Sequence, residues 1–126
     1  MLTNSQKKYL LTIYLLGQNG EKVRITDIAS FLGVAKASTV RMMEKLTAEG
    51  YISTQPYKQI GLTGKGVAEA NRMFTPSVIL QDFFAAKVGL PHEKASSAAM
   101  LISADLDNEA LDKFVSFALS QREVQT

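Results

Sequence analysis

The segment Ile25–Ile52, ITDIASFLGVAKASTVRMMEKLTAEGYI, determines which fold the chain adopts. Its part DIASFL has the apolar spacing of a short amphipathic helix, which Thr26 is placed to cap and which Gly33 ends. The residues VAKA form a turn into a longer helix that runs to about Glu49 and ends at Gly50. Two helices joined by such a short turn predict a helix-turn-helix motif.

The flanking sequence adds further helices and a hairpin. Asn4 or Ser5 is placed to cap a first helix that runs to about Gln18, and KVRI follows as a short extended piece. After the motif, YISTQ and QIGLT predict the two strands of a hairpin, and Thr63 caps a helix that we expect Pro76 to interrupt. The remaining helices are expected over residues 76–89, 91–104 and 108–121.

This order of elements predicts a mainly α fold with two parts. Residues 1–75 are expected to form a winged helix-turn-helix DNA-binding domain. Residues 76–126 are expected to form a helical dimerisation domain.

The composition excludes several classes of function. The chain of 126 residues has no cysteine, which excludes disulfides and thiolate metal sites, and it has one histidine, which leaves little room for a nucleophile–base pair. No apolar run approaches the roughly 18 residues of a membrane span. We therefore expect a cytoplasmic protein that is not an enzyme.

The charge is distributed unevenly along the chain. Residues 1–66 carry nine Lys or Arg and four Asp or Glu, a net charge of +5. Residues 67–126 carry five and eight, a net charge of −3. A basic half beside an acidic half indicates that the basic half meets a polyanion.

One face of the helix after the turn is polar and basic. At about 100° per residue, Arg41 and Lys45 fall within about 60° of Ser38. Arginine can pair with guanine edges, serine and threonine can reach bases or phosphates, and lysine neutralises the backbone. With the helix start and the hairpin tip, the predicted DNA-binding set is Lys36, Ala37, Ser38, Thr39, Arg41, Lys45, Lys58 and Gln59. The opposite side is expected to be core, formed by Val40, Met43 and Leu46 with Ile28, Phe31 and Leu32 of the preceding helix. An ordinary solvated helix face has the same pattern, and this alternative stays open on the sequence alone.

The second half carries more apolar side chains than about fifty residues can bury. The stretch VILQDFFAA wraps apolar residues beyond one helical stripe, so two of its surfaces must be covered. A symmetric homodimer is the economical solution. The predicted interface residues are Ile79, Leu80, Phe83, Phe84, Leu101 and Phe114. The alternative is a helical cap that packs only on its own winged helix.

These residues carry a resemblance to a known family. The segment Ile25–Ile52 with GLTGKG, preceded by KKYLLTIYLL and followed by VILQDFFAAKVGL and LDNEALDKF, resembles the diphtheria-toxin-repressor and manganese-transport-regulator (DtxR/MntR) family over nearly the whole chain. The resemblance implies a homodimer that binds palindromic operators in double-stranded DNA and represses metal-uptake genes when its metal is bound. Within the family, the chain resembles the short, manganese-type members.

The chain departs from the family at the regulatory metal site. The positions that the resemblance assigns to the metal ligands are Lys8, Leu11, Ser77, Met100, Ser103 and Ala104. None of these is a usual ligand of Mn²⁺ or Fe²⁺, which prefer carboxylate and imidazole. The only histidine, His92, is expected at the protein surface. We expect a degenerate metal site and no cofactor.

The sequence supports a homodimeric, sequence-specific transcriptional regulator, most simply a repressor, without Mn²⁺ or Fe²⁺ control. A first alternative is regulation by another, unidentified ligand or protein partner. A second is a winged helix that serves as a protein-interaction module and no longer binds DNA.

Overall fold

The computed structural model describes residues 2–18, 20–55 and 59–124, and it divides into two compact units. The units are Met1–Asn71 and Arg72–Thr126. Their boundary lies inside one helix, α4 (Gly64–Phe83), whereas the sequence places the domain boundary four residues later in the same helix. No helix within the described ranges is both long and apolar enough to cross a bilayer.

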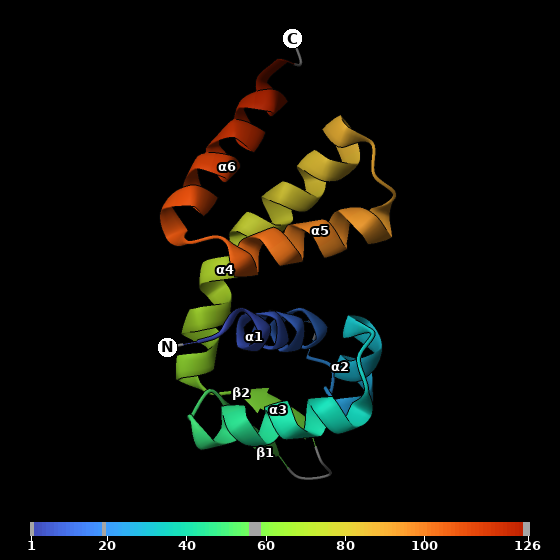
Figure 1. The fold of residues 1–126 in the computed structure, drawn as a ribbon, viewed down its shortest axis with the longest axis vertical. Coiled ribbons are helices and arrows are strands. Elements are labelled where there is room, and N and C mark those ends of the chain that lie inside the picture. Colours follow the sequence, from blue (N-terminus) through green and yellow to red (C-terminus); the bar gives the residue numbers. More distant parts are fainter. Residues whose placement is uncertain (1, 19, 56–58, 125–126) are drawn as a thin grey trace. The chain divides into compact units, whose positions relative to one another are not determined.

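The first unit is a winged helix-turn-helix (Figure 1). Its helices are α1 (Asn4–Leu16), α2 (Ile25–Leu32) and α3 (Lys36–Ala48), and α4 begins in it. The wing is an antiparallel pair of strands, β1 (Ile52–Gln55) and β2 (Gln59–Leu62), in which Ile52 pairs with Leu62. This confirms the mainly α fold class.

The first two helices begin at caps that differ from those expected. Thr3, rather than Asn4 or Ser5, caps α1: its Oγ1 accepts from the Gln6 N–H at 3.1 Å, and the Gln6 Oε1 accepts from the Thr3 N–H at 2.9 Å. Arg24, rather than Thr26, precedes α2, and its N–H donates to the Asp27 carboxylate at 3.0 Å. In both helices the side chain three residues after the cap satisfies the cap's N–H.

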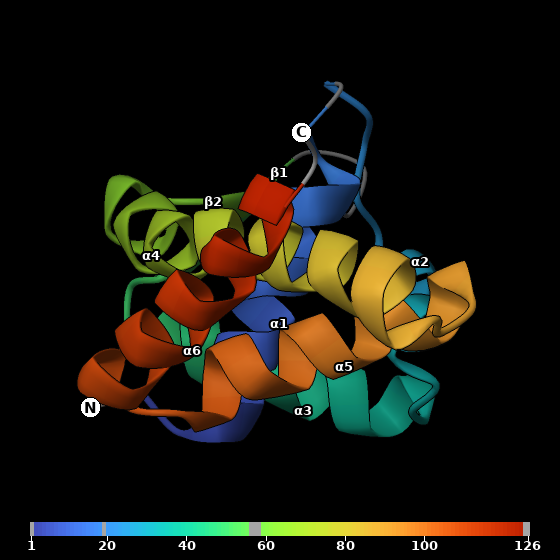
Figure 2. The same ribbon diagram turned by 90° about the horizontal axis from the view of Figure 1, so that it is seen from above.

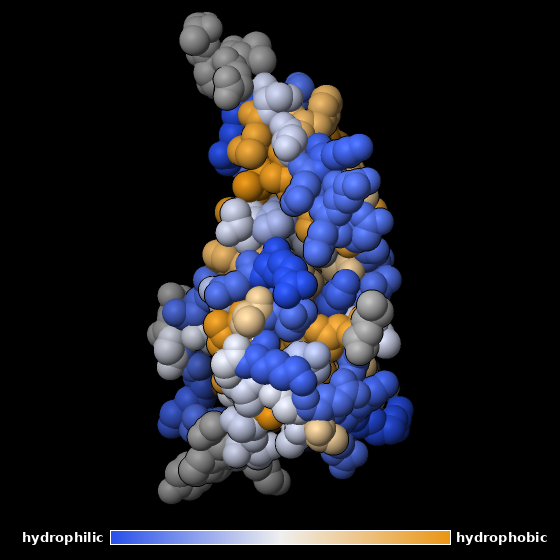
Figure 3. Space-filling view, turned by 90° about the vertical axis from the view of Figure 1, so that its left-hand side faces the viewer, coloured by the Kyte–Doolittle hydropathy of each residue, from blue (hydrophilic) through white to orange (hydrophobic). Residues whose placement is uncertain are grey.

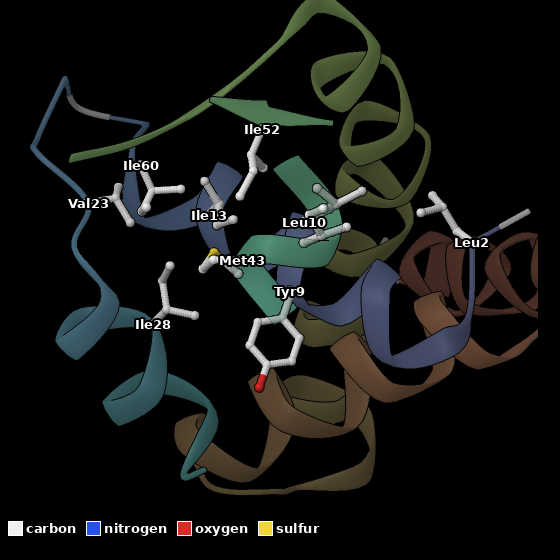
Figure 4. Packing of buried hydrophobic residues seen from close by; sticks show 10 residues of the cluster. Leu2, Tyr9, Leu10, Ile13, Val23, Ile28, Met43, Ile52 and Ile60 are labelled. Carbon is white, nitrogen blue, oxygen red and sulfur yellow. The ribbon is translucent and has the colours of Figure 1, made fainter. Parts of the chain in front are cut away.

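The core of the first unit draws side chains from every element of the motif (Figure 4). Leu10, Ile28 and Leu46 are fully buried, and Figure 4 shows Ile13, Met43, Ile52 and Ile60 pointing toward one another. Phe31 was expected in this core but is 45% exposed. The buried residues of α2 are Ile28 and Ala29, so the helix turns this edge, and not Phe31, toward the core.

The wing is tied to the rest of its unit along its outer edge. The Ile60 N–H donates to the Val23 carbonyl at 2.7 Å, so the predicted extended piece before α2 runs beside β2. Ile25, which was counted with this piece, is already the first residue of α2. The wing thereby gains a short third segment on one side.

The second unit is helical. It contains the rest of α4, a π-helical turn over Phe84–Val88, α5 (His92–Asp105) and α6 (Asn108–Ser120), which ends in a 3₁₀ turn over Gln121–Val124. In Figures 1 and 2 the C-terminal half of α4 packs with α5 and α6. The shared core includes Leu80, Ala95, Ala99, Leu111 and Ala118.

Pro76 lies within α4 and does not interrupt it, contrary to the sequence-based expectation. The buried positions of the helix are Gly66, Ala70, Met73, Ser77 and Leu80, and Phe84 continues them into the π-helical turn, at intervals of three and four residues. An internal proline costs a helix roughly 3 kcal/mol. Burial of this continuous stripe favours an unbroken helix and offsets that cost. The Ser77 hydroxyl also donates to the Phe74 carbonyl at 2.7 Å in the same turn.

Candidate nucleic-acid interface

The exposed face of α3 is basic and polar. Lys36, Ala37, Arg41 and Lys45 are exposed, and Ser38 is half-buried. The Arg41 Nη2 donates to the Ser38 Oγ at 3.4 Å, one helical turn away, so the two side chains lie side by side. Five of the eight residues predicted to bind DNA are therefore at least partly exposed on this helix, and three of them, Ser38, Arg41 and Lys45, share one face.

Thr39 does not share that face. Its side chain is fully buried and its hydroxyl donates to the Ala35 carbonyl at 3.1 Å. The hydroxyl is thus used within the first turn of α3, and Thr39 is removed from the surface that could contact DNA.

The hairpin tip is described only in part. Gln59 begins β2 and is half-buried. Lys58 lies outside the described residues. The prediction that these two residues contact DNA stays a prediction.

The turn before α3 depends on Gly33. This residue has φ +69°, the left-handed conformation that ends a helix, and the Val34 N–H after it donates to the Ala29 carbonyl at 3.0 Å. The chain then enters α3 at Lys36, and Lys36 and Ala37 at its start are exposed.

The C-terminal end of α3 is fixed by contacts that the sequence analysis missed. The C-cap residue Glu49 accepts from the Gln6 side chain of α1 at 3.0 Å, and its backbone carbonyl accepts from the Lys65 Nζ at 2.9 Å. Lys65 also stands 4.3 Å above the centre of the Tyr51 ring. The motif LTGKG could have indicated part of this arrangement, because it contains Lys65 and also Thr63, which donates to the Gly50 carbonyl at 2.7 Å.

The positions assigned to the family's metal site are mostly buried. Leu11, Ser77, Met100, Ser103 and Ala104 are buried, and Lys8 is half-buried. Across the described ranges, no group of three or more His, Asp or Glu side chains is placed to hold an ion. Among the described residues, the Ser103 hydroxyl is buried and has no hydrogen-bond partner. A single hydroxyl is nevertheless a poor ligand for Mn²⁺ or Fe²⁺. The residues present do not fit the family's metal.

His92 is exposed, as expected, at the start of α5. Its Nδ1 lies 3.4 Å from the Gln81 amide nitrogen.

The predicted dimer residues differ in how much surface they leave for a partner. Leu80 is fully buried and Phe84 is 9% exposed, so both serve the core of their own unit and are corrections to the predicted interface. Ile79, Phe83 and Phe114 are half-buried against that core, whereas Leu101 is 46% exposed. The second unit exposes other large apolar side chains outside the predicted interface set: Val78, Val88, Phe117 and Leu119. Figure 3 shows apolar surface near the C-terminal end of the chain.

The winged helix-turn-helix with an exposed basic α3 defines a class, the DNA-binding transcriptional regulators. Residues 1–60 match the family described as "Iron dependent repressor, N-terminal DNA binding domain". The chain is 29% identical over 117 residues to the HTH-type transcriptional regulator MJ0568 of Methanocaldococcus jannaschii, covering 92% of this chain and 94% of the relative. It is also 29% identical over 113 residues to the HTH-type transcriptional regulator MntR of Lysinibacillus sphaericus, covering 90% and 81%. The first 60 residues thus match the DNA-binding domain of the iron-dependent repressors, and the chain as a whole is similar to MntR-type helix-turn-helix regulators.

Solved structures share the fold. The manganese regulator SloR matches with a TM-score of 0.70 at 23% identity over 92% of this chain, and IdeR of T. acidophilum matches with 0.73 at 21% over 98%. In both cases the match covers 55% of the solved chain, so this chain spans about half the length of those proteins.

Proposed function

We propose that the chain is a homodimeric transcriptional repressor that binds specific sequences in double-stranded DNA through α3 and that Mn²⁺ and Fe²⁺ do not control. The observation that carries the proposal is the column of half-buried Ser38 with exposed Arg41 and Lys45 on the second helix of the motif. In this class of motif the second helix enters the major groove and its N-terminal residues meet base edges.

The chemistry of the column suits this role. The Arg41 guanidinium can donate two parallel hydrogen bonds to the O6 and N7 of guanine. Lys36 and Lys45 supply positive charge that attracts the phosphate backbone whatever its sequence. Base recognition is therefore assigned to Arg41, and general affinity to the two lysines.

The absence of metal control rests on the donor chemistry of the six metal-site positions. They offer an ammonium, two hydroxyls, a thioether and two aliphatic side chains. An ion stabilises a protein only by binding the folded state better than the unfolded one, and these groups give Mn²⁺ and Fe²⁺ no such preference.

The test is binding to duplexes that the wild-type chain enriches from a random-sequence library. Arg41→Ala is expected to weaken binding to the enriched duplex by about 1–3 kcal/mol and to relax one base preference. Lys45→Ala should weaken binding to enriched and scrambled duplexes alike and reduce the salt dependence, as loss of a phosphate contact does. Mn²⁺ and chelator should both leave the affinity unchanged. Failure to enrich any duplex, or a requirement for Mn²⁺, would contradict the proposal.

The homodimer is expected to depend on Phe117. This side chain is 57% exposed in the single chain, although its ring also lies 6.0 Å from that of Phe83. Phe117→Glu would place a charge in an apolar interface and should convert the dimer into folded monomers. Sedimentation equilibrium measures the change, and Ser116→Glu, an exposed position on the same helix, is the matched control. A wild-type chain that sediments as a monomer at micromolar concentration would refute the dimer.

A further inference from the structure

The C-terminal end of the recognition helix α3 is held by hydrogen bonds from two other helices and from Thr63. At this end Glu49 accepts hydrogen bonds from Gln6 of α1 and from Lys65 of α4, at 3.0 and 2.9 Å. Thr63 adds bonds to the carbonyls of Gly50 and Tyr51, at 2.7 and 3.0 Å. The far end of α3 follows directly from the helix-turn-helix turn.

Gln6 is the unusual member of this set because it is a polar side chain that is only 1% exposed. Its Oε1 completes the capping box of α1 with Thr3, and its Nε2 donates to the Glu49 carboxylate. One buried amide therefore joins the start of α1 to the end of α3, across 43 residues of sequence.

Geometry makes this junction important for recognition of bases. The 13 residues of α3 span about 20 Å, so a tilt of roughly 5° at Glu49 would move the Lys36 end by roughly 2 Å. A recognition site must be held to about 0.5 Å to keep its hydrogen bonds. Non-specific attraction to phosphates is far less sensitive to such a displacement.

We infer that Gln6 is a positioning residue for DNA recognition: through Glu49 it sets the tilt of α3, and so the match between Arg41 and the base edges. The inference rests on the proposed function, since it concerns the same helix. It assigns a role in specificity to a residue that lies on another helix.

Exchange of donor and acceptor tests this role. Gln6→Glu keeps the capping box, because a carboxylate accepts from the Thr3 N–H as the amide does, but it faces the Glu49 carboxylate with a like charge. The double variant Gln6→Glu/Glu49→Gln restores one donor and one acceptor and keeps the net charge of the chain. The readout is the ratio of affinities for an enriched and a scrambled duplex, measured well below the melting temperature of every variant. The added charge of the single variant lowers both affinities, so the ratio isolates the position of α3.

We expect the ratio to fall about tenfold in Gln6→Glu and to recover in the double variant, the pattern of a direct coupling. Thr3→Ala, which removes only the hydroxyl half of the capping box, should lower the melting temperature and leave the ratio unchanged. If Gln6→Glu fails to fold, Glu49→Ala removes the same bond at an exposed position and should lower the ratio equally.

Two results would overturn the inference. One is a lower melting temperature in Gln6→Glu or Glu49→Ala with an unchanged ratio, which would show a purely structural bond. The other is a lowered ratio that the double variant does not restore. A wild-type chain that enriches no duplex would instead refute the proposed function itself, so the two failures are distinguishable.

Discussion

Replacement of Gly66 by alanine is expected to destabilise the N-terminal unit by about 3 kcal/mol, the upper part of the range for overpacking. A Cβ at this position would overlap the backbone carbonyl oxygen of Tyr51 and approach the Leu62 Cδ2 to 3.1 Å. The obstacle is backbone rather than the end of a flexible side chain, so the start of α4 must move away from Tyr51, the residue before β1. That movement would also break the hydrogen bond from the Thr63 N–H to the Tyr51 carbonyl.

The matched control for this variant lies in the same helical turn. A Cβ added to Gly64 has no atom within 4 Å, so Gly64→Ala should be neutral or stabilise by up to about 1 kcal/mol through the unfolded chain. Urea denaturation followed by circular dichroism measures both variants. Equal stability of the two would contradict the close contact at Gly66.

The second large effect is expected at Leu11. Leu11→Glu places a carboxylate, the kind of ligand that Mn²⁺ prefers, at one of the six metal-site positions, but the side chain at this position is fully buried. An uncompensated buried carboxylate costs about 3–5 kcal/mol, and the half-buried Lys8, one turn earlier on α1, can offset only part of this. The variant should therefore be destabilised, and Mn²⁺ should not restore its melting temperature.

Leu11→Met is the control that separates the effect of the buried charge from the effect of a changed side-chain shape. Methionine has a similar volume and no charge, so it should cost less than about 1.5 kcal/mol. Thermal melts of both variants with Mn²⁺ and with chelator provide the measurement. A melting temperature of Leu11→Glu that rises with Mn²⁺ would show that the remaining positions can still complete a metal site.

The course of the chain through the winged helix could be predicted because several of its boundaries have a local signal, although the first residues of α1 and α2 were misplaced. Gly33 ends α2 in the left-handed conformation. At the start of α4 the Thr63 hydroxyl donates to the Gly50 carbonyl and accepts from the Gly66 N–H. Pro76 was misinterpreted because a local rule for proline was applied without regard to the buried stripe from Ala70 to Phe84, which continues through it.

Thr39 illustrates a different error in the site. On the helical wheel it falls between Leu46 and Met43, about 100° from Ser38, so its angle already predicted burial. The hydroxyl suggested a contact with DNA, but in a first turn a threonine can bond the carbonyl four residues earlier, as it does here to Ala35.

The contact between Gln6 and Glu49 could not have been predicted in this way. Nothing in the local pattern around either residue specifies a partner 43 positions away, and Gln6 is a residue type that is usually exposed. Such pairs follow from the crossing of α1 and α3, which is known only once the helices are packed.

The hydrogen bond between Ile60 and Val23 affects how the wing unfolds. A two-stranded ribbon alone is at best marginally stable in water. Here the inner residues of both strands, Ile52 and Ile60, are buried in the core of the first unit, and the segment before α2 closes part of the outer edge of β2. These contacts join the two strands to the core around α1 and α3, so we expect the strands to open together with that core. The Ile60 amide should exchange its hydrogen for deuterium only when that whole unit opens.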